Sequence, residues 1–197
     1  MNARHLLVWF HVLTGVGWMS MALALATLLI WGLSNNDTSA FEAARVIDGQ
    51  LLRHLGTSAA FAGFMLSALT PWGYFRYWWV LAKAAITISQ LYVGVFILSP
   101  NLDTRPSWAL VAGSLLMVSA LAFQAWLSIA KPWKLTPWSP RRKPPSAPSW
   151  QYLAAVAVPI ADYVLFKAPL LSLLVVIGYP IYRARLLRRS SQSAKAT

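Results

Sequence analysis

The chain has 197 residues, of which 58% are hydrophobic and only 11% are charged. Soluble domains carry about 25% charged residues, so this composition excludes an ordinary soluble domain and predicts an integral membrane protein. The formal net charge is +12 and cysteine is absent, which excludes disulfides, thiolate metal sites and thiol catalysis.

Four apolar runs in the first two thirds of the chain are long enough for helices that cross a bilayer, which takes roughly 20 residues. The predicted spans cover about residues 6–33, 51–69, 78–98 and 108–130. Residues 39–56 have helical apolar spacing and are expected to lie at the membrane surface before the second span. The sequence therefore predicts an all-α fold, a polytopic transmembrane bundle whose four core helices occupy residues 1–130.

The remainder of the chain changes character twice. Residues 131–150 contain six prolines and five cations, a composition typical of an extended basic linker. Residues 151–182 are apolar but include Pro159, Asp162, Lys167 and Pro169. They form either a hairpin of two short helices, broken near Lys167–Pro169, or a single kinked fifth span. Residues 183–197 form a basic and then polar tail.

The distribution of Lys and Arg predicts the orientation, because cytoplasmic segments of membrane proteins are enriched in both. With the N-terminus inside, Arg76 and the linker also lie inside, and a hairpin at residues 151–182 brings the basic tail to the same side. We therefore expect a multi-pass protein of the plasma membrane with a cytoplasmic N-terminus and linker. Its expected partner is the lipid bilayer, and no motif for nucleic acid accompanies the positive charge.

Tryptophan is unusually frequent, with 11 residues. Most lie at predicted span ends, as in an interfacial belt. These are Trp31, Trp72, Trp78, Trp79, Trp108, Trp133, Trp138 and Trp150. Trp18 lies deeper, where an aromatic side chain can line a cavity for a flat or polyisoprenoid ligand.

Ionisable residues inside apolar runs are costly and mark candidate sites. His11 and His54 each either bind a metal or form a hydrogen bond to a neighbouring helix. Their predicted depths differ by roughly 15 Å, so we do not expect them to share one metal. Lys83 either extends to the inner surface or faces the interior, where its ammonium can hold an anionic group. Asp162 either pairs with Lys167 or is kept protonated by burial.

A family resemblance rests on two segments of the sequence. The run FHVLTGVGWMSMALAL places His11 six residues before Trp18, and AGFMLSALTPWGYFRYWWVLAKAAITISQL joins two helices by a short loop and places Lys83 early in the second. With KPW after the fourth span, these residues resemble the copper-resistance D-like membrane proteins and their actinobacterial relatives over about residues 6–133. The resemblance implies a four-helix core, with copper passage or haem binding, and identifies His11 and Lys83 as the matching positions. The segment from Tyr152 onward lies outside this pattern.

Two main functions are compatible with these residues. The first is a protein that binds or passes a small ligand (haem, a metal such as copper, or a hydrophobic molecule) within the bundle. Its candidate residues are His11, Lys83, His54, Trp18, Trp72, Tyr77 and Trp78, with His11 and His54 as candidate metal ligands. The alternative is a membrane enzyme that acts on a lipid-soluble substrate such as an isoprenoid, in the manner of an acid-initiated terpene cyclase. Its candidate acids are Asp162, Asp48 and Glu42, facing aromatic walls. A role as a subunit of a larger membrane complex is also open.

Overall fold

The computed structural model describes residues 2–139 and 145–193, and every regular element in these segments is helical. This confirms the predicted all-α bundle. The α-helices are α1 (Ala3–Asn35), α2 (Thr38–Ile47), α3 (Arg53–Leu69), α4 (Trp78–Val93), α5 (Ser99–Thr104), α6 (Trp108–Ala130), α7 (Ser149–Ala161) and α8 (Leu170–Ser193). Three π-helical stretches lie between them: η1 (Asp48–Leu52), η2 (Gly94–Leu98) and η3 (Asp162–Phe166).

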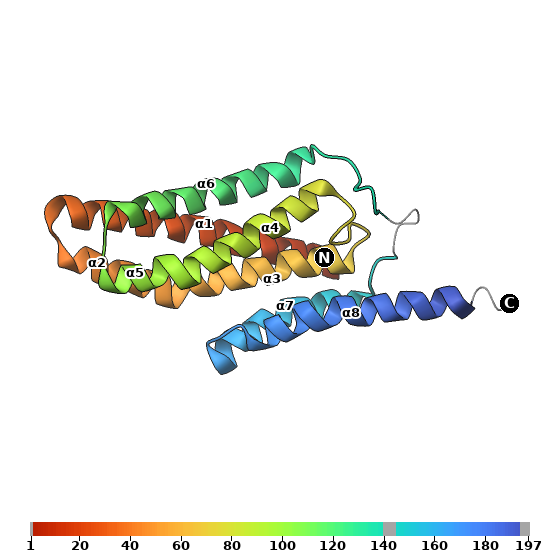
Figure 1. Ribbon diagram of the computed structural model, residues 1–197. Helices are drawn as coiled ribbons and strands as arrows, with labels where there is room; N and C mark the ends of the chain where they lie inside the picture. Colours follow the sequence, from red (N-terminus) through yellow and green to blue (C-terminus); the bar gives the residue numbers. More distant parts are fainter. Residues whose placement is uncertain (1, 140–144, 194–197) are drawn as a thin grey trace.

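Two pairs of elements are joined by these π stretches into longer helices. The elements α2, η1 and α3 follow one another without a break and run back along α1 (Figure 1). The expectation that residues 39–56 lie at the membrane surface stays a prediction, and the structure shows that they run directly into α3. Ala40 and Ala44 are buried, because their small side chains let α2 pack closely against α1.

The third predicted span is also longer than expected. Its apolar run was predicted to stop at Leu98, before Ser99 and Pro100, but α4, η2 and α5 continue to Thr104. Proline lacks the amide hydrogen that an α-helix uses, and it is tolerated at the first turn of a helix. Pro100 lies in the first turn of α5, directly after the wider π turn, so the helix continues through it.

Four helical stretches within the described residues are long and apolar enough to cross a membrane. They are Ala3–Asn35, Trp78–Thr104, Trp108–Ala130 and Ser149–Phe166. This supports the predicted membrane protein, but α3, the predicted second span, is not among them. Because α3 packs against α1, α4, α7 and α8, much of its surface meets other helices, and small residues such as Ala59 and Ala62 suit that position.

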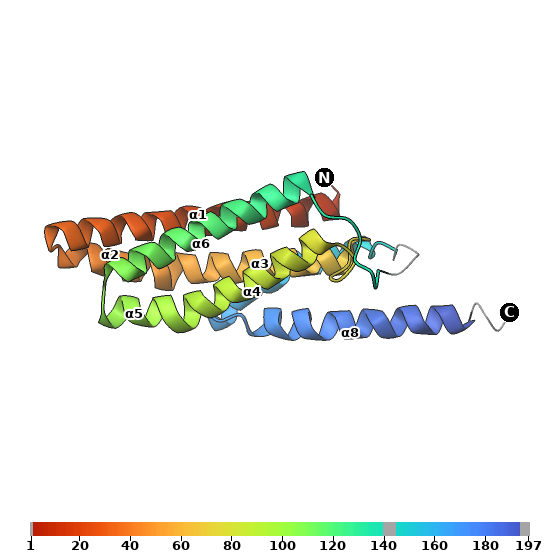
Figure 2. The same cartoon turned by 45° about the horizontal axis from the view of Figure 1, so that its top comes forward.

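The C-terminal apolar segment is a helical hairpin, one of the two predicted alternatives. Helix α7 continues through η3, and the chain then breaks at Lys167, whose φ is 54°. Helix α8 returns from there toward the end of the molecule that carries the N-terminus (Figure 2). The hairpin turn lies level with the beginning of α3, where the rings of His54 and Tyr163 are 4.9 Å apart.

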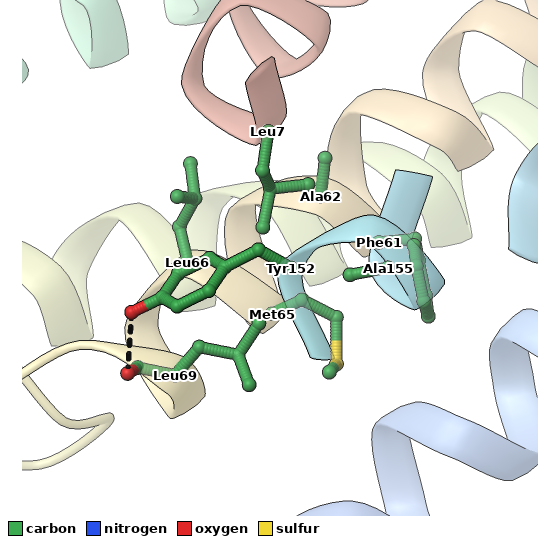
Figure 3. Close-up of a cluster of buried hydrophobic side chains, with 8 residues drawn as sticks. All are labelled: Leu7, Phe61, Ala62, Met65, Leu66, Leu69, Tyr152 and Ala155. Atoms are coloured by element: carbon green, nitrogen blue, oxygen red, sulfur yellow. Dashed lines mark hydrogen bonds between the residues drawn. The ribbon is translucent and has the colours of Figure 1, made fainter. Parts of the chain in front are cut away.

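Three buried clusters follow one another along α1. The first joins α1, α3 and α7 through Leu7, Phe61, Ala62, Met65, Leu66, Leu69, Tyr152 and Ala155 (Figure 3). The Tyr152 hydroxyl donates a hydrogen bond of 2.8 Å to the Leu69 carbonyl, which fixes the hairpin on α3. The second is centred on Trp18, Ala59 and Met117, and the third on Leu25, Leu29, Ala44, Leu102, Leu110 and Val111.

The two ends of the bundle differ in charge. Asp37 and Glu42 lie near the junction of α1 and α2, and Asp103 lies near the end of α5. Asp48 begins η1, between α2 and α3, and Asp162 begins η3, next to the hairpin turn. The opposite end carries the N-terminus, the turn between α3 and α4, and the segment after α6 (Figures 1 and 2). We call this the basic end, because Arg4, Arg76, Lys131, Lys134 and Arg183 lie there.

Candidate functional site

A stripe of polar side chains faces α6 from α4. Lys83, Thr87 and Gln90 are spaced four and three residues apart, so they lie on one face of α4. Gln124 and Ser128 oppose them from α6. We call these five residues the polar seam. Thr87, Gln90 and Gln124 are buried, although both helices are apolar enough to cross a membrane.

Hydrogen bonds connect the seam along its length. The Gln124 side chain accepts from Thr87 at 2.8 Å and donates to Gln90 at 2.5 Å, and the Gln90 amide donates to the Met117 carbonyl at 2.9 Å. The Lys83 ammonium donates to the Ser128 hydroxyl at 2.5 Å, and that hydroxyl donates to the Gln124 carbonyl at 3.0 Å. In an apolar environment such bonds hold helices together, and they also mark routes for polar solutes.

Lys83 turns toward the bundle, which is the interior alternative of the two that its sequence position left open. Its one partner within the described residues is the neutral Ser128 hydroxyl. The ion pairs among the described residues, Arg45–Asp103 and Arg53–Asp48, lie toward the end of the bundle opposite the basic end. The ammonium therefore has no carboxylate beside it, and its two remaining N–H groups suit an anion or another acceptor.

His11, on α1, is close enough to this lysine for the two groups to interact electrostatically. Its Nδ1 is 2.9 Å from the Ala59 carbonyl oxygen. Because a carbonyl only accepts, Nδ1 carries the hydrogen, and Nε2 of the neutral ring keeps a lone pair. Gly63 leaves room for the ring, since a Cβ there would lie 2.9 Å from Cε1 of His11.

At its other end the polar seam meets a cavity of about 40 Å³. Met117, whose carbonyl accepts from Gln90, is one of the lining residues, together with Trp18, Ser114, Ser99 and Asp48. Ser99 donates to the Asp48 carboxylate at 2.6 Å, and Arg53 donates to Ser99 at 3.0 Å. Hydrogen-bonded polar groups thus extend from Lys83 to the Met117 carbonyl and occur again at Ser99, Asp48 and Arg53, whereas most of the cavity lining between them is apolar.

The cavity lies where two π stretches face each other. Asp48 and Leu52 of η1 and Gly94 and Leu98 of η2 all line it. A π turn holds one extra residue and has a wider backbone than an α turn, and such turns are frequent at functional sites. The widened turns explain why the packing between the two long helices is incomplete at this level.

The other two predicted acids, Asp162 and Glu42, do not face this cavity or the polar seam. The Asp162 carboxylate is 4% exposed and accepts from the backbone amides of Leu171 and Ser172, both at 2.8 Å. It caps the beginning of α8, and the expected pairing with Lys167 is wrong; Lys167 instead lies 5.4 Å from the centre of the Tyr163 ring. Glu42 is exposed on α2.

The predicted aromatic residues divide between the core and the basic end. Trp18 is buried beside Gly56, where a Cβ would lie 3.0 Å from its ring. Two cations lie near Trp72, with Arg4 5.8 Å and Lys131 5.5 Å from its ring centre. Trp78 packs edge to face on Trp138 at 5.4 Å. Tyr77 lies 5.9 Å from the guanidinium of Arg76, which is buried rather than exposed.

A larger, open groove of about 700 Å³ lies outside the bundle at the basic end. It is lined by Trp78, Leu81, Ala82, Ala85, Pro132, Trp133 and Lys134. These α4 positions lie on the opposite face of the helix from Lys83, Thr87 and Gln90. The groove is therefore separate from the polar seam.

The geometry does not favour haem or copper at the two histidines. His11 contacts α3 at Ala59 and Gly63, whereas His54 lies near Gly56, which packs on Trp18. Trp18 is seven residues beyond His11, so the level of Trp18 and Gly56, near His54, is about 10 Å from the level of His11 along α1. Within the described residues, no group of three His, Asp or Glu side chains can hold a metal ion. The cavity is far smaller than the sites of about 300 Å³ or more that enclose larger ligands.

Sequence reasoning missed Thr87, Gln90, Gln124 and Ser128, because it considered ionisable residues only. A usable signal was present: the polar residues Lys83, Thr87 and Gln90 recur at helical spacing in an apolar run. Tyr74 and Arg183, described below, gave no such signal, because their proximity depends on the return of α8.

Comparison with protein-family models, with curated proteins and with solved structures gives no match. The resemblance to copper-resistance D-like proteins therefore rests on the sequence segments quoted above.

Proposed function

We propose that this protein binds a small anionic solute in the interior of its helical bundle and passes it along the polar seam. Lys83 is the binding residue, with His11 beside it as the second polar group. The cavity near Asp48 and Ser99 is the other end of the route. The observation that carries the proposal is the inward-facing Lys83 ammonium, whose one described partner is the neutral Ser128 hydroxyl.

Two physical arguments support an anionic solute. A cation in an apolar environment is costly unless it is paired, and all five carboxylates of the chain lie elsewhere in the fold. The seam also offers Thr87, Gln90 and Gln124 as groups that can exchange their mutual hydrogen bonds for bonds to a solute. A role in which the seam only joins α4 and α6 needs the glutamines and Thr87 but gives no reason for a lysine.

The proposal includes the predicted orientation in a plasma membrane. The basic end would face the cytoplasm, since Lys and Arg collect at cytoplasmic ends. Lys83 would then lie on the cytoplasmic side of the seam, and Asp48 on the outer side.

The enzyme alternative has less support from the geometry. Asp162 caps α8 and Glu42 is exposed, so Asp48 is the one candidate acid that lines a cavity with an aromatic residue, Trp18. That cavity has room for a few water molecules rather than for an isoprenoid.

Anion flux through liposomes tests the proposal. The full chain is reconstituted, and efflux of chloride and of acetate is measured after the membrane potential is clamped with valinomycin and potassium. Lys83→Met should lower the flux about tenfold or more, because one charge-assisted contact is lost, and Lys83→Arg should retain part of it. Lys134→Met, which removes an exposed cation outside the seam, is the matched control. Flux equal to that of protein-free liposomes, or undiminished flux in Lys83→Met, would overturn the proposal.

A further inference from the structure

A second group of polar side chains lies at the basic end, outside the polar seam. Tyr74 comes from the turn between α3 and α4, and Arg183 comes from α8. The Tyr74 hydroxyl is buried and has no hydrogen-bond partner within the described residues, and the same is true of Nη1 of Arg183. The other terminal nitrogen of Arg183, Nη2, donates to the Pro145 carbonyl, which holds the guanidinium in place.

The two groups share one environment. The Tyr74 ring packs against Phe64 of α3 at 6.2 Å, and α8 packs on α3, so Arg183 acts electrostatically on the Tyr74 hydroxyl. Burial, and then the neighbouring Tyr179, raises the pKa of Tyr74, while Arg183 has the opposite effect. Tyr74 is therefore a neutral O–H donor at physiological pH. Tyr179 donates its own hydrogen to Gln151 at 2.6 Å.

Among the residues that the structure describes, the site thus presents two buried donors and no matching acceptor. A buried donor without a partner costs stability, so an acceptor is expected there. None of the five acidic side chains supplies it, because Asp37, Glu42, Asp48, Asp103 and Asp162 all lie toward the other end. This end of the bundle is cationic, and Arg4 and Lys131 both lie near the ring of Trp72 there. An arginine beside a hydroxyl donor in a cationic environment suits phosphate oxygens.

We propose that Tyr74 and Arg183 bind the phosphate group of an anionic phospholipid headgroup. The tryptophans around this end favour a lipid over free phosphate as its source. Tryptophan is enriched at the headgroup level of membrane proteins. At this end of the bundle the helix ends and the adjoining segments carry Trp72, Trp78, Trp133, Trp138 and Trp150. The bound lipid would fasten α8 to the turn between α3 and α4. This site is independent of the solute route proposed above.

Thermal unfolding of the full chain in a non-ionic detergent tests the inference, with tryptophan fluorescence as the signal. Short-chain phosphatidylglycerol should raise the midpoint in a saturable manner, since a ligand that binds the folded state stabilises it. The lipid concentration at half-saturation should rise about tenfold in Arg183→Gln and about fivefold in Tyr74→Phe. Arg185→Gln and Tyr182→Phe, which change exposed residues of the same helix, should leave it unchanged.

Two further arms separate the sources of phosphate. Short-chain phosphatidylcholine should bind more weakly, because its choline cation is repelled by the basic end, and inorganic phosphate should have no comparable effect at equal concentration. A stronger effect of inorganic phosphate would overturn the assignment to lipid. Equal half-saturation in the wild type and Arg183→Gln would overturn the site itself. Arg183→Lys keeps the charge, so its half-saturating lipid concentration should lie between those of the wild type and Arg183→Gln. Circular dichroism checks that each variant is folded.

Discussion

Asp162 gives the most specific prediction for the stability of the hairpin. Its carboxylate is 4% exposed and accepts two backbone hydrogen bonds of 2.8 Å, from Leu171 and Ser172 in the first turn of α8. Asp162→Ala leaves both amides without a partner in a buried position. Losing a helix cap costs about 1 kcal/mol, and a hydrogen bond to a charged group is worth about 1.5–3 kcal/mol. We therefore expect a loss of about 2–4 kcal/mol.

Hydrogen exchange measured by mass spectrometry is the assay, because it reports the hairpin separately from the rest of the bundle. Amides of residues 170–176 should exchange at least tenfold faster in Asp162→Ala, while those of α6 stay protected. Asp162→Asn keeps one acceptor oxygen and should have about half the effect. Asp103→Ala, in an exposed ion pair with Arg45, is the control and should cost at most about 1 kcal/mol.

The outcome also separates the two roles considered for Asp162. Unchanged protection of α8 in Asp162→Ala would refute the capping argument and would return this carboxyl to the list of candidate acids. Faster exchange confined to the hairpin would instead assign it to folding.

Two further predictions concern a glycine and a tyrosine. Gly63→Ala should destabilise the fold by about 1–3 kcal/mol, because the added Cβ would lie 2.9 Å from His11. Gly15→Ala is the control and should be neutral or slightly stabilising, because no atom lies within 4 Å of its added Cβ. Thermal unfolding of both variants measures the difference. Because the pKa of Tyr74 is raised in the folded protein, the unfolded state loses this proton first as the pH rises above the ordinary tyrosine value of 10.0. Above that pH the wild type should therefore lose stability relative to Tyr74→Phe, by up to about 1.4 kcal/mol per pH unit. An equal pH dependence of the two unfolding midpoints would contradict this prediction.

Long apolar runs were the part of the fold that could be predicted well from sequence. The helices at 3–35, 78–104 and 108–130 were predictable because their apolar runs are longer than those of buried helices in soluble proteins. The weaker signal was α3, which is surrounded by other helices and needs no uniformly apolar surface. The three π stretches could not be foreseen, because they arise from how neighbouring helices pack and not from a local sequence signal.

The candidate site was predictable only in outline. His11 and Lys83 were identified as ionisable residues inside apolar runs, and the structure places them close enough to interact electrostatically. Their surroundings were not predictable, since Ser128 meets Lys83 only when α6 packs against α4. The predicted pairing of Asp162 with Lys167 was wrong for the same reason. Proximity in sequence favoured Lys167, whereas the hairpin turn places the backbone amides of Leu171 and Ser172 at the carboxylate.

The length of α1 has a consequence for how the molecule sits in a bilayer. Its 33 residues extend about 50 Å, whereas the hydrocarbon layer is about 30 Å thick. Tilting alone would require more than about 50°, beyond the range of about 0–40° found for transmembrane helices. Part of α1 must therefore project from the hydrocarbon, and if the basic end sits at one interface, the projecting part carries α2 and its acids. On that condition the cavity near Asp48 would lie close to the aqueous phase, and the solute route proposed above would be shorter than the full thickness of the bilayer.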